Sequence, residues 1–487
     1  MTFIPDVRVI ADGLTVDNAP SDDPRDALLG GPEGDRWLVW ARNGAQVDFG
    51  AVRATVRALS ESGAAIAFGD SLTAVGGDVV RRPVFDAVRL RSQDYLGDVL
   101  VLNRERCAAL ATDSRTAPLV AWRHELLLDA ARENLGVIHA GRSLEASPRH
   151  EHALLTPQEL DATRAVLQRH LDKSGGGVVH SVGSDGVHRA RRNVVGKPLV
   201  SMVIPTRATR MPDGSSLVID ALASIVELTT YDAWEVVLVV DSGADPRVLD
   251  QARALLGTRL RAVSYTAPFN FSAKVNLGVA HARGEFILML NDDVKVISES
   301  WLEALLAPAQ HDGVGMVGAM LYFSDNTIQH AGHHYWLGDA SHIGLDVSRG
   351  SAGPLDGFRV ERRVAGVTAA CALMPLHVFE EVGGLDEGLP GAFNDVDLCL
   401  KTTWAGFDIV WTPDAELYHF ESKSRDASVK AFEIYRHWNR WGFRMHQPGT
   451  WPYPLDRPAR EPAPSAPLGW RSEQTQAGAG GRGERQG

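Results

Sequence analysis

The chain has 487 residues, an apolar fraction of 44% and a formal net charge of −12 at pH 7. This length suggests roughly two or three domains, and the apolar fraction is high enough for packed cores. The negative charge, without any Lys/Arg-rich block, argues against nucleic acid as the main partner. The three cysteines, Cys107, Cys371 and Cys399, have no zinc-binding spacing and are typical of buried thiols in a reducing cytoplasm.

The sequence carries little sign of membrane insertion. Residues 1–6 lack the basic and long apolar regions of a signal peptide. No stretch approaches the ~20 apolar residues that a membrane-spanning helix needs. We therefore expect a cytoplasmic protein whose contact with a membrane is at most peripheral.

Residues 1–150 loosely repeat the pattern of the central part of the chain. Three pairs of segments match: 34–44 with 284–293, 99–106 with 371–374 and the helix after it, and 124–129 with 394–399. The first copy has Arg42-Asn43-Gly44 where the second has an acidic triplet, and it lacks room for the two opening strands. We predict a shortened, degenerate α/β domain without a metal site. A chance match between unrelated α/β elements is the alternative.

Residues 151–196 are predicted to form a helical connector. Thr156-Pro157-Gln158-Glu159 is a capping box with proline at the first helical position, which marks the start of a helix. That helix should end near Lys173-Ser174, before three consecutive glycines.

Residues 197–445 alternate between strand and helix patterns. Apolar runs predict the strands, and apolar residues at helical spacing predict the helices between them. In chain order we expect a strand at 199–204, a helix at 217–228, a strand at 236–240, a helix at 249–256, a strand at 260–265, a helix at 272–282 and a strand at 286–290. This alternation is typical of βαβ units and a mostly parallel sheet.

The C-terminal part adds two helices and a tail. A helix is expected at 394–404, with Gly406 as the glycine just beyond its end. Residues 432–441, in which aromatic and basic residues alternate, are predicted to form a helix packed on this domain, with membrane-surface binding as the alternative. Residues 446–487, rich in Pro and then in Gly and Arg, are predicted to be a disordered tail.

The triplet Asn291-Asp292-Asp293 is the strongest functional signal. It follows the apolar run predicted to be a buried strand at 286–290. Two adjacent carboxylates at the end of a buried strand are costly to keep ionised unless a cation lies between them. Ligands of open α/β sheets bind at the carboxyl ends of the strands. The triplet therefore predicts a divalent metal ion and a phosphate at this edge, although Asn-Asp-Asp is also common in turns.

Two other segments fit a nucleotide at the same edge of the sheet. Asp241 ends the strand at 236–240 and could accept the N3–H of a uracil or thymine ring; the alternative is an Asp that caps the next helix. Ser272 is a candidate N-cap for the helix at 272–282, whose N-terminus suits a diphosphate. Lys274 could add a positive charge there.

Further candidates lie toward the C-terminus. Asp395 could be a general base with Asp397 as its supporting partner; the alternative is that the helix dipole alone favours acidic residues there. His419 could be a third metal ligand, because neutral imidazole joins carboxylates in mixed metal sites. The histidine cluster at 330–334 fits no zinc motif by spacing, so we assign it to a substrate-region loop.

Taken in order, these motifs resemble a family 2 glycosyltransferase with the GT-A fold. Residues 199–206 resemble the family's opening strand, and Asp241 its nucleobase aspartate. Asn291-Asp292-Asp293 resembles its metal-binding DxD-type motif. Asn394-Asp395 resembles its Glu-Asp pair, in which the Asp is the catalytic base.

Three more segments resemble particular members of that family. Tyr418–Arg425 resembles the closing His-x-Glu-Ser segment of rhamnosyl- and galactofuranosyl-type members. Residues 329–332 and 364–371 resemble a subgroup of O-antigen or rhamnan-type transferases. The resemblance covers about residues 197–445.

The resemblance implies an inverting, metal-dependent transfer of a sugar from a UDP- or dTDP-sugar to a hydroxyl of a glycan or lipid-linked acceptor, in cell-surface polysaccharide biosynthesis. Mg²⁺ or Mn²⁺ would be held by Asp293, Asp292 and His419, and Asp395 would be the base. The implied donor-nucleotide residues are Pro205, Thr206, Asp241, Lys274, Asn276, Asn291 and Asp292. The implied acceptor or sugar region includes His330, Thr368, Asn394 and Asp397.

The chain departs from the family pattern at two positions. Asn291 stands at the first DxD position, which leaves Asp293 as the main ligand and Asp292 as the second. Asn394 replaces the Glu of the Glu-Asp pair, so Asp395 is the base at that step. The N-terminal half resembles a second, degenerate GT-A-like domain and is not expected to catalyse a reaction.

Two other functions remain open from the sequence. A sugar-nucleotidyltransferase could use the same sheet and metal, but it leaves residues 394–395 without a role. A non-catalytic protein that binds a nucleotide or a glycan would not need the acidic residues that the second half keeps.

Overall fold

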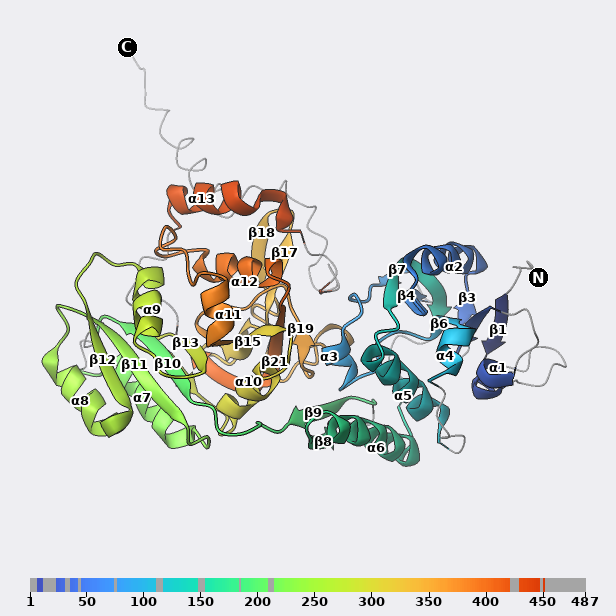
Figure 1. Cartoon of the computed structure of the whole chain (residues 1–487), viewed down its shortest axis with the longest axis horizontal. Helices are drawn as coiled ribbons and strands as arrows, with labels where there is room; N and C mark the ends of the chain where they lie inside the picture. The colour runs from blue at the N-terminus through green and yellow to red at the C-terminus, as the bar shows by residue number, and fades with distance from the viewer. Residues whose placement is uncertain are drawn as a thin grey trace, which may run out of the picture. The chain divides into compact units, whose positions relative to one another are not determined.

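A computed structural model of the chain describes residues 7–11, 23–30, 36–42, 45–73, 77–110, 117–147, 154–183, 185–208, 214–420, 429–446 and 450–451. The chain divides into two compact units (Figure 1). The first contains Met1–Arg192 with Pro354–Glu361 and Gly449–Asp456, and the second is built from Asn193–Gly353 and Arg362–Pro448. Most of the predicted tail at 446–487, and the Glu-Ser part of Tyr418–Arg425, lie outside the described residues.

The second unit is built on a large mixed sheet. Four of its strands are parallel and adjacent: β12 (Leu260–Tyr265), β11 (Trp234–Asp241), β10 (Val200–Thr206) and β13 (Phe286–Leu290). The sheet continues through β20 (Cys371–Pro375), β15 (Val314–Tyr322), β21 (Asp408–His419) and β14 (Val294–Val296). The predicted parallel half is confirmed, and the other half is mixed in direction because β20 and β14 pair antiparallel with their neighbours.

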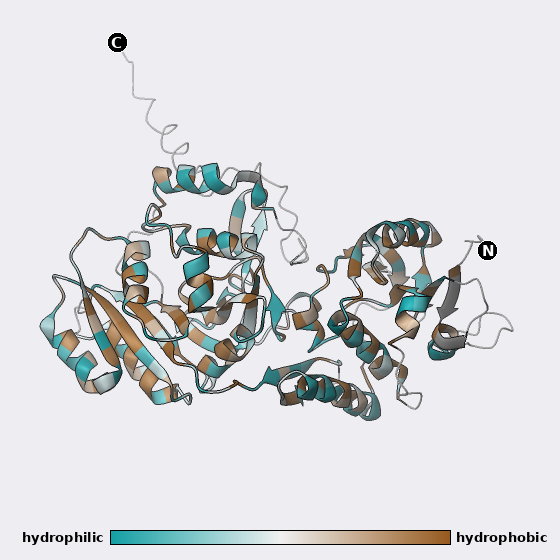
Figure 2. Ribbon diagram, viewed as in Figure 1, coloured by the Kyte–Doolittle hydropathy of each residue, from teal (hydrophilic) through white to brown (hydrophobic). Residues whose placement is uncertain are grey.

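Helices cover this sheet. They are α7 (Leu217–Leu228), α8 (Pro246–Leu256), α9 (Phe271–Ala280), α10 (Trp301–Ala309), α11 (Leu376–Glu381), α12 (Asn394–Trp404) and α13 (Ala431–Trp441). Hydrophobic residues run along the strands beneath them, whereas α13 is largely hydrophilic (Figure 2). The limits predicted for α7, β12, β13 and α12 agree with the structure. Gly406, just past α12, has the left-handed φ of +95° expected of a glycine beyond a helix end.

Close packing fixes α9 on the sheet. A Cβ atom on Gly278 would lie 2.4 Å from the side chain of Val203 and 2.9 Å from that of Val239, so a larger residue would push the helix off β10 and β11. The N-cap of α9 is Asn270, whose side chain accepts the N–H of Ala273. The prediction that Ser272 is the N-cap is therefore wrong. The hydroxyl of Ser272 is buried in the first turn of α9 and donates to the carbonyl of Leu389 at 2.7 Å.

A small hairpin extends from the mixed half of the sheet. The short strand β16 (Ile328–His330) pairs with β15, and β17 (His333–Trp336) pairs with β18 (Asp339–His342). The short strand β19 (Arg362–Arg363) pairs with β21. In Figure 1 the β17–β18 hairpin lies near one end of α13. Gly338, at the hairpin turn, leaves room for the ring of Trp438 on α13, because a Cβ there would lie 2.2 Å from that ring.

The first unit is a smaller α/β unit. Its sheet contains β1 (Val7–Ala11), β2 (Trp37–Ala41), β6 (Val99–Asn103), β4 (Ile66–Thr73), β7 (Val137–Ser147) and β3 (Gln46–Val47) in that order, and β5 (Val79–Val80) pairs with β4. Its first helices are α1 (Pro24–Gly30), α2 (Phe49–Ser62), α3 (Ala87–Leu90), α4 (Arg104–Ala108) and α5 (Leu119–Arg132).

The two sheets share strand order and strand direction. β1, β2, β6, β4, β7 and β3 stand in the order of β10, β13, β20, β15, β21 and β14. β1–β2 and β4–β7 are parallel, and the other three pairs are antiparallel, as in the second unit. The segment matches made from the sequence fall on β2 with β13, β6 with β20, and α5 with α12. The prediction that the first unit lacks both opening strands is wrong for one of them, because β1 stands in the place of β10. The described residues contain no strand in the places of β11 and β12.

The segment expected to be a connector belongs to the first unit. Helix α6 (Pro157–Lys173) has the predicted capping box, in which Thr156 and Glu159 bond each other's backbone N–H. Its apolar face buries Val166, Leu167 and Leu171 in the core of the first unit. The hairpin of β8 (Gly177–Ser181) and β9 (His188–Arg192) follows, and the first segment of the unit ends at Arg192. Among the described residues, no helix is long and apolar enough to cross a membrane.

Candidate functional site

The candidate residues gather where β10, β11 and β13 end, which we call the carboxyl edge. The three strands are parallel neighbours, so their C-terminal residues lie side by side. Thr206 ends β10, Asp241 ends β11, and Asn291-Asp292-Asp293 follows β13. Strand β20 is antiparallel to β13, so its first residues begin at this same edge.

Asp292 faces β10 at this edge. Its Oδ2 accepts a hydrogen bond of 2.6 Å from the hydroxyl of Thr206. Burial raises the pKa of Asp292 to about 6; the bond from Thr206 lowers it in part, and the charge of Asp293 raises it further. A cation beside this carboxyl group would favour its ionised form.

Asp293 faces His419, which ends β21. The distance from His419 Nε2 to Asp293 Oδ1 is 3.2 Å, and the backbone N–H of Phe420 donates to the carbonyl of Asp293. The side-chain amide of Asn291 also lies 3.0 Å from His419 Nε2. The predicted pairing of Asp293 with His419 is therefore formed, whereas the carboxyl group of Asp292 bonds Thr206.

Gln329, on β16, orients His419. Its Oε1 lies 2.7 Å from His419 Nδ1, and its amide nitrogen lies 3.4 Å from the His419 carbonyl. A neutral ring therefore carries its proton on Nδ1, and its Nε2 lone pair faces both the Asn291 amide and Asp293 Oδ1. A cation between Nε2 and Asp293 Oδ1, either a proton or a metal ion, would stabilise their close approach. An outer residue that fixes a histidine tautomer is typical of metal sites.

Asp241 is held by Lys274 from α9. Lys274 is 1% exposed, and its Nζ lies 2.8 Å from Asp241 Oδ1 and donates to the carbonyl of Thr206 at 2.8 Å. Both contacts are internal, so the structure gives no support to the expectation that Lys274 offers its charge to a diphosphate. The lysine instead ties the ends of β10 and β11 together.

Replacing Lys274 with Met should destabilise the protein by about 2–3 kcal/mol. Removing one partner of a buried ion pair typically costs ~3–5 kcal/mol, and the partly exposed Asp241 lowers that value. Denaturant unfolding of Lys274→Met beside Arg253→Met, which breaks an exposed helix pair, measures the difference. Equal unfolding free energies for the two variants would show that the Lys274 pair has no special stabilising role.

Asn276 is hydrogen-bonded to the loop between α11 and α12. Its amide nitrogen donates to the carbonyl of Leu385 and to Glu387, and its oxygen accepts the N–H of Leu385, all at 3.0 Å. Its expected contact with the donor nucleotide is therefore not supported, because the loop uses the polar atoms of this side chain. This loop runs from α11 to α12, so Asn276 helps to position the start of α12.

Asp395 lies in the first turn of α12, next to the start of β20. The N–H of Ala369 donates to its Oδ2 at 3.3 Å, and the N–H of Val396 donates to its Oδ1 at 2.8 Å. The neighbouring Ala370 accepts the N–H of Asn291. Asp395 is thus joined to the Asn291-Asp292-Asp293 triplet through two adjacent residues, and it is only half-buried.

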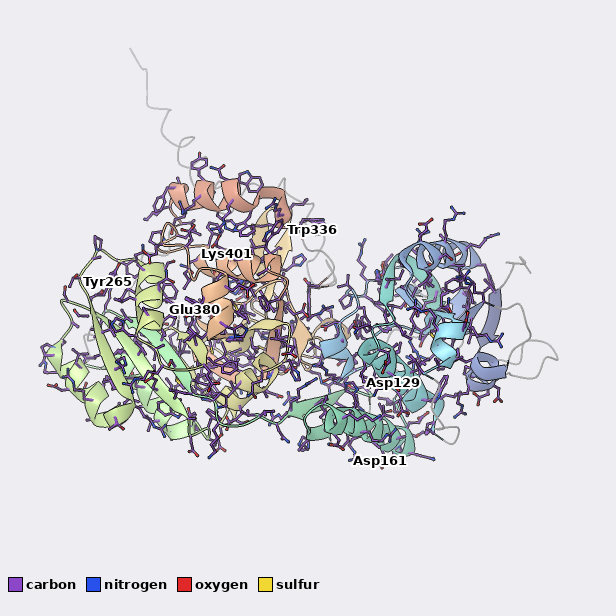
Figure 3. The ribbon with its side chains drawn as sticks, viewed as in Figure 1. Asp129, Asp161, Tyr265, Trp336, Glu380 and Lys401 are labelled. Carbon is purple, nitrogen blue, oxygen red and sulfur yellow. The ribbon has the colours of Figure 1, made fainter. Side chains whose placement is uncertain are left out.

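Asp397 points away from this edge. It is fully buried and accepts the indole N–H of Trp441 at 2.8 Å, with Arg440 at 3.2 Å and Lys401 at 3.4 Å. Its expected role as a partner of the base or of the acceptor is not supported. Asp397 instead anchors α13 to α12, where Figure 3 labels Lys401. Asn394, at the first position of α12, is also buried.

Helix α13 holds the loop that leads to Asp395 by hydrogen bonds and a ring contact. Glu433 is 2% exposed and accepts the N–H groups of Gly391 and Ala392 at 2.7 and 2.8 Å. Phe393 has a left-handed φ of 59° and stacks on His437 with ring centroids 4.6 Å apart. The helix expected at 432–441 therefore packs on the second unit, and its buried face holds the strained turn before Asp395.

Stability should fall in acid partly because of His437. Burial lowers its pKa from 6.5 to about 4, so the unfolded chain binds more protons between these values and unfolding becomes easier as pH falls below 6.5. His437→Phe keeps the stack on Phe393 and removes the titration. We expect it to abolish ~1 kcal/mol of the stability loss between about pH 7 and 5.5. Denaturant titrations at both pH values, with exposed His281→Phe as the control, measure this; parallel curves for His437→Phe and wild type would contradict it.

His330 and Thr368 meet beside Asp395. The N–H of Thr368 donates to His330 Nε2 at 3.2 Å, and the hydroxyl of Thr368 accepts the N–H of Ala370. The expected link of His330 and Thr368 to this region is therefore formed. Two contacts could not be predicted from the sequence: that of Gln329 with His419, and that of Glu433 with the backbone before Asp395. Each joins residues that lie far apart in the chain.

A groove of about 790 Å³ lies between the end of β12 and the start of α9. Tyr265, which Figure 3 labels at the end of β12, is the register partner of Asp241 and lines the groove with Phe269, Asn276 and Glu387. The guanidinium of Arg207, the residue after Thr206, lies over the Phe269 ring at 5.3 Å. Aromatic walls beside a polar strand end suit a planar ring with a polar edge.

A model of a protein family described as "Glycosyltransferase like family 2" matches residues 198–442. This range contains the whole carboxyl edge, α12 and α13. The chain belongs to this glycosyltransferase-like family 2.

Two curated relatives match the chain. Protein y4gI of Sinorhizobium fredii is 39% identical over 275 residues, which are 55% of this chain and 30% of that protein. The O-antigen biosynthesis protein RfbC of Myxococcus xanthus is 31% identical over 376 residues, which are 73% of this chain and 29% of that protein. The chain thus spans less than a third of the length of these relatives.

Two solved structures are distantly similar to this family member. GalNAc-T7 with UDP, GalNAc and Mn²⁺ has a TM-score of 0.41 and 15% identity, over 60% of this chain and 59% of that one. The mannosyltransferase PcManGT of Pyrobaculum calidifontis, with GDP-Man and Mn²⁺, has a TM-score of 0.36 and 16% identity, over 52% of this chain and 64% of that one.

Proposed function

We propose that the second unit is an inverting glycosyltransferase that uses a UDP- or dTDP-sugar. The observation that carries this proposal is the junction of Asp293, His419 and Asp395 at one sheet edge, with Asp241 two strands away. A nucleobase would lie in the groove beside Asp241, with its N3–H toward that carboxylate. The diphosphate would lie along the carboxyl edge, where Thr206 and Asp292 end neighbouring strands.

Asp293 and His419, with Asp292 as a second carboxylate, would hold the divalent metal. Oxygen ligands with one imidazole suit Mg²⁺ or Mn²⁺, and the two facing acceptor atoms of Asp293 and His419 fit a cation. When bound, the metal would neutralise charge on the departing diphosphate.

Asp395 would take the proton of the acceptor hydroxyl. The acceptor oxygen bonds to the anomeric carbon as the bond from that carbon to the diphosphate breaks, and the hydroxyl proton passes to Asp395. Attack from the face opposite the leaving group inverts the configuration. Two backbone N–H groups hold the carboxylate in place for this transfer.

We propose a glycan or lipid-linked glycan as the acceptor, in cell-surface polysaccharide biosynthesis in the cytoplasm. The support is the similarity to an O-antigen biosynthesis protein. Phe432 and Tyr435, 54% and 58% exposed on the outer side of α13 near Arg436 and Arg440, are the surface that we propose for peripheral contact with the inner face of the cytoplasmic membrane.

We propose that the first unit is a degenerate copy that does not catalyse transfer. Its support is the shared strand order, with Arg42 in the place of Asn291. Arg42 pairs with Asp98 at 3.1 Å, and Arg123 pairs with Asp94 at 3.2 Å. Guanidinium groups and their carboxylate partners thus fill this edge of the smaller sheet, which leaves no need for a metal ion.

Donor hydrolysis with the purified chain tests the function. UDP- and dTDP-sugars are screened with Mn²⁺ or Mg²⁺, with and without EDTA, and the released nucleoside diphosphate is measured. Metal-dependent release from one donor supports the transferase and names its sugar. Formation of pyrophosphate and a sugar phosphate would point to a nucleotidyltransferase instead, and metal-independent nucleotide binding without turnover would point to a binding protein.

A further inference from the structure

Three histidines converge beside the β17–β18 hairpin. His330 ends β16, and His333 and His342 are register partners across the hairpin. Their rings stand nearly perpendicular in all three pairs, with centroids 4.9 to 5.0 Å apart. One ring nitrogen of each lies within 4.8 Å of the others. We refer to these three residues as the histidine triad.

Two of the three imidazole rings of the triad are buried. His330 and His333 are 1% and 2% exposed, whereas His342 is more exposed to solvent. The Nδ1 atom of His333 is buried and has no hydrogen-bond partner among the described residues. A buried nitrogen without a partner is costly unless a ligand completes it.

Burial favours the neutral form of two of the three imidazoles. It lowers the pKa of His330 well below its usual value, and His342, His333 and Arg362 add to this effect. It lowers the pKa of His333 to about 3, where His342 adds to the effect and Asp395 opposes it. Neutral rings keep a lone pair for a metal ion. The charged neighbours are Arg362, which acts on His330, and Asp395, which acts on His333.

We propose that the histidine triad binds a transition-metal cation of the Zn²⁺ class. Three imidazoles without a carboxylate in the group favour Zn²⁺, Co²⁺ or Ni²⁺ over Mg²⁺ or Ca²⁺. Three protein ligands also leave a fourth position for water. Small ring rotations would give the ~3.4 Å nitrogen separation that tetrahedral bonds of ~2.1 Å require.

One proton must move within His330 when the cation binds. Because His330 Nε2 accepts the N–H of Thr368, the neutral ring carries its proton on Nδ1, which lies 2.9 Å from His342 Nδ1. A metal at His330 Nδ1 requires this proton to shift to Nε2, because a neutral imidazole ligand keeps one N–H, and Nε2 can then no longer accept from Thr368. Binding should therefore break the bond from Thr368 and disturb the segment whose next residue, Ala369, donates to Asp395.

The triad is separate from the proposed donor-metal site. Gln329 and His330 are successive residues of β16, so their side chains point to opposite faces. Gln329 orients His419 on one face, and His330 joins the triad on the other. Figure 3 labels Trp336, near the end of the hairpin that carries His333 and His342.

Metal titration of the whole chain tests the proposal. The protein is purified without a polyhistidine tag and stripped of metal, and Zn²⁺ is then added in competition with a chromophoric chelator. We expect one Zn²⁺ per chain in wild type and in Asp293→Asn, which alters only the donor-metal site. His333→Ala and the more exposed His342→Ala should bind at least about tenfold more weakly.

The control is His446→Ala, whose ring contacts Trp336 on the same hairpin but lies outside the triad. It should bind Zn²⁺ like wild type. Co²⁺ absorption provides a second readout: tetrahedral nitrogen ligation gives strong visible bands, which His342→Ala should lose. Absence of a site in wild type, or Zn²⁺ binding that is lost in Asp293→Asn and kept in His342→Ala, would overturn the proposal whether or not the chain transfers a sugar.

Discussion

Asp395→Asn should lower sugar transfer by ~10²–10⁴-fold while leaving donor binding unchanged, because a positioned general base typically contributes that much. The amide has nearly the same shape as the carboxylate, so its oxygen can still accept the N–H of Ala369 or Val396. It cannot take the proton of the acceptor hydroxyl. The measurements are kcat with the donor identified by the hydrolysis screen and calorimetric affinity for the nucleoside diphosphate.

The control for this variant is Asp250→Asn on α8, where the carboxylate is 72% exposed and pairs with Arg253. Asp250→Asn should leave both kcat and the affinity for the nucleoside diphosphate unchanged. Near-normal turnover of Asp395→Asn would mean that another group accepts the proton. Loss of nucleotide affinity in the same variant would mean that Asp395 contacts the donor rather than the acceptor.

Asp293→Asn should weaken metal-dependent binding of the nucleoside diphosphate by at least about tenfold and abolish turnover. Loss of even an outer partner of a metal ligand typically costs ~10–100-fold in metal affinity, and Asp293 is the proposed main ligand. The substitution removes the negative charge that faces His419 Nε2 at 3.2 Å. Calorimetry of UDP and dTDP with Mn²⁺ or Mg²⁺, repeated in EDTA, gives the metal-dependent part of the affinity.

Exposed Asp312→Asn is the matched control and should bind like wild type. If Asp293→Asn keeps the full metal-dependent affinity, the ligand assignment is wrong. Together with Asp395→Asn, this variant separates two steps. The Asp293 change should act on donor binding and turnover, whereas the Asp395 change should act on turnover only.

Local patterns were enough to predict the parallel half of the catalytic sheet. An unbroken apolar run such as Phe286–Leu290 can only be buried, and the helical spacing of Leu217–Leu228 has one apolar face. Parallel strands end at one edge of a sheet, so the placement of Thr206 and Asp292 at the same edge follows from the strand pattern, whereas their direct contact depends on the strand order. The capping box at Thr156 was equally local, since its partners are three residues apart.

The site expectations that the structure does not support concern polar side chains with several possible partners. Lys274, Asn276 and Asp397 were all assigned to the substrate from their place near the site. In the structure each bonds a distant part of the chain: the ends of β10 and β11, the loop at 385–387, and Trp441. For the buried Lys274 and Asp397, these bonds offset the cost of an unpaired polar group inside the protein.

The sequence by itself determined the strand-and-helix order, the acidic edge of the sheet and the family, because these depend on local spacing and on motifs in fixed order. Only the tertiary structure decided that Gln329 orients His419 and that Glu433 holds the turn before Asp395. It also decided that His342 joins His330 and His333 across a hairpin. Such contacts depend on strand register and helix docking, which the packing of the whole unit sets and no short stretch of sequence encodes.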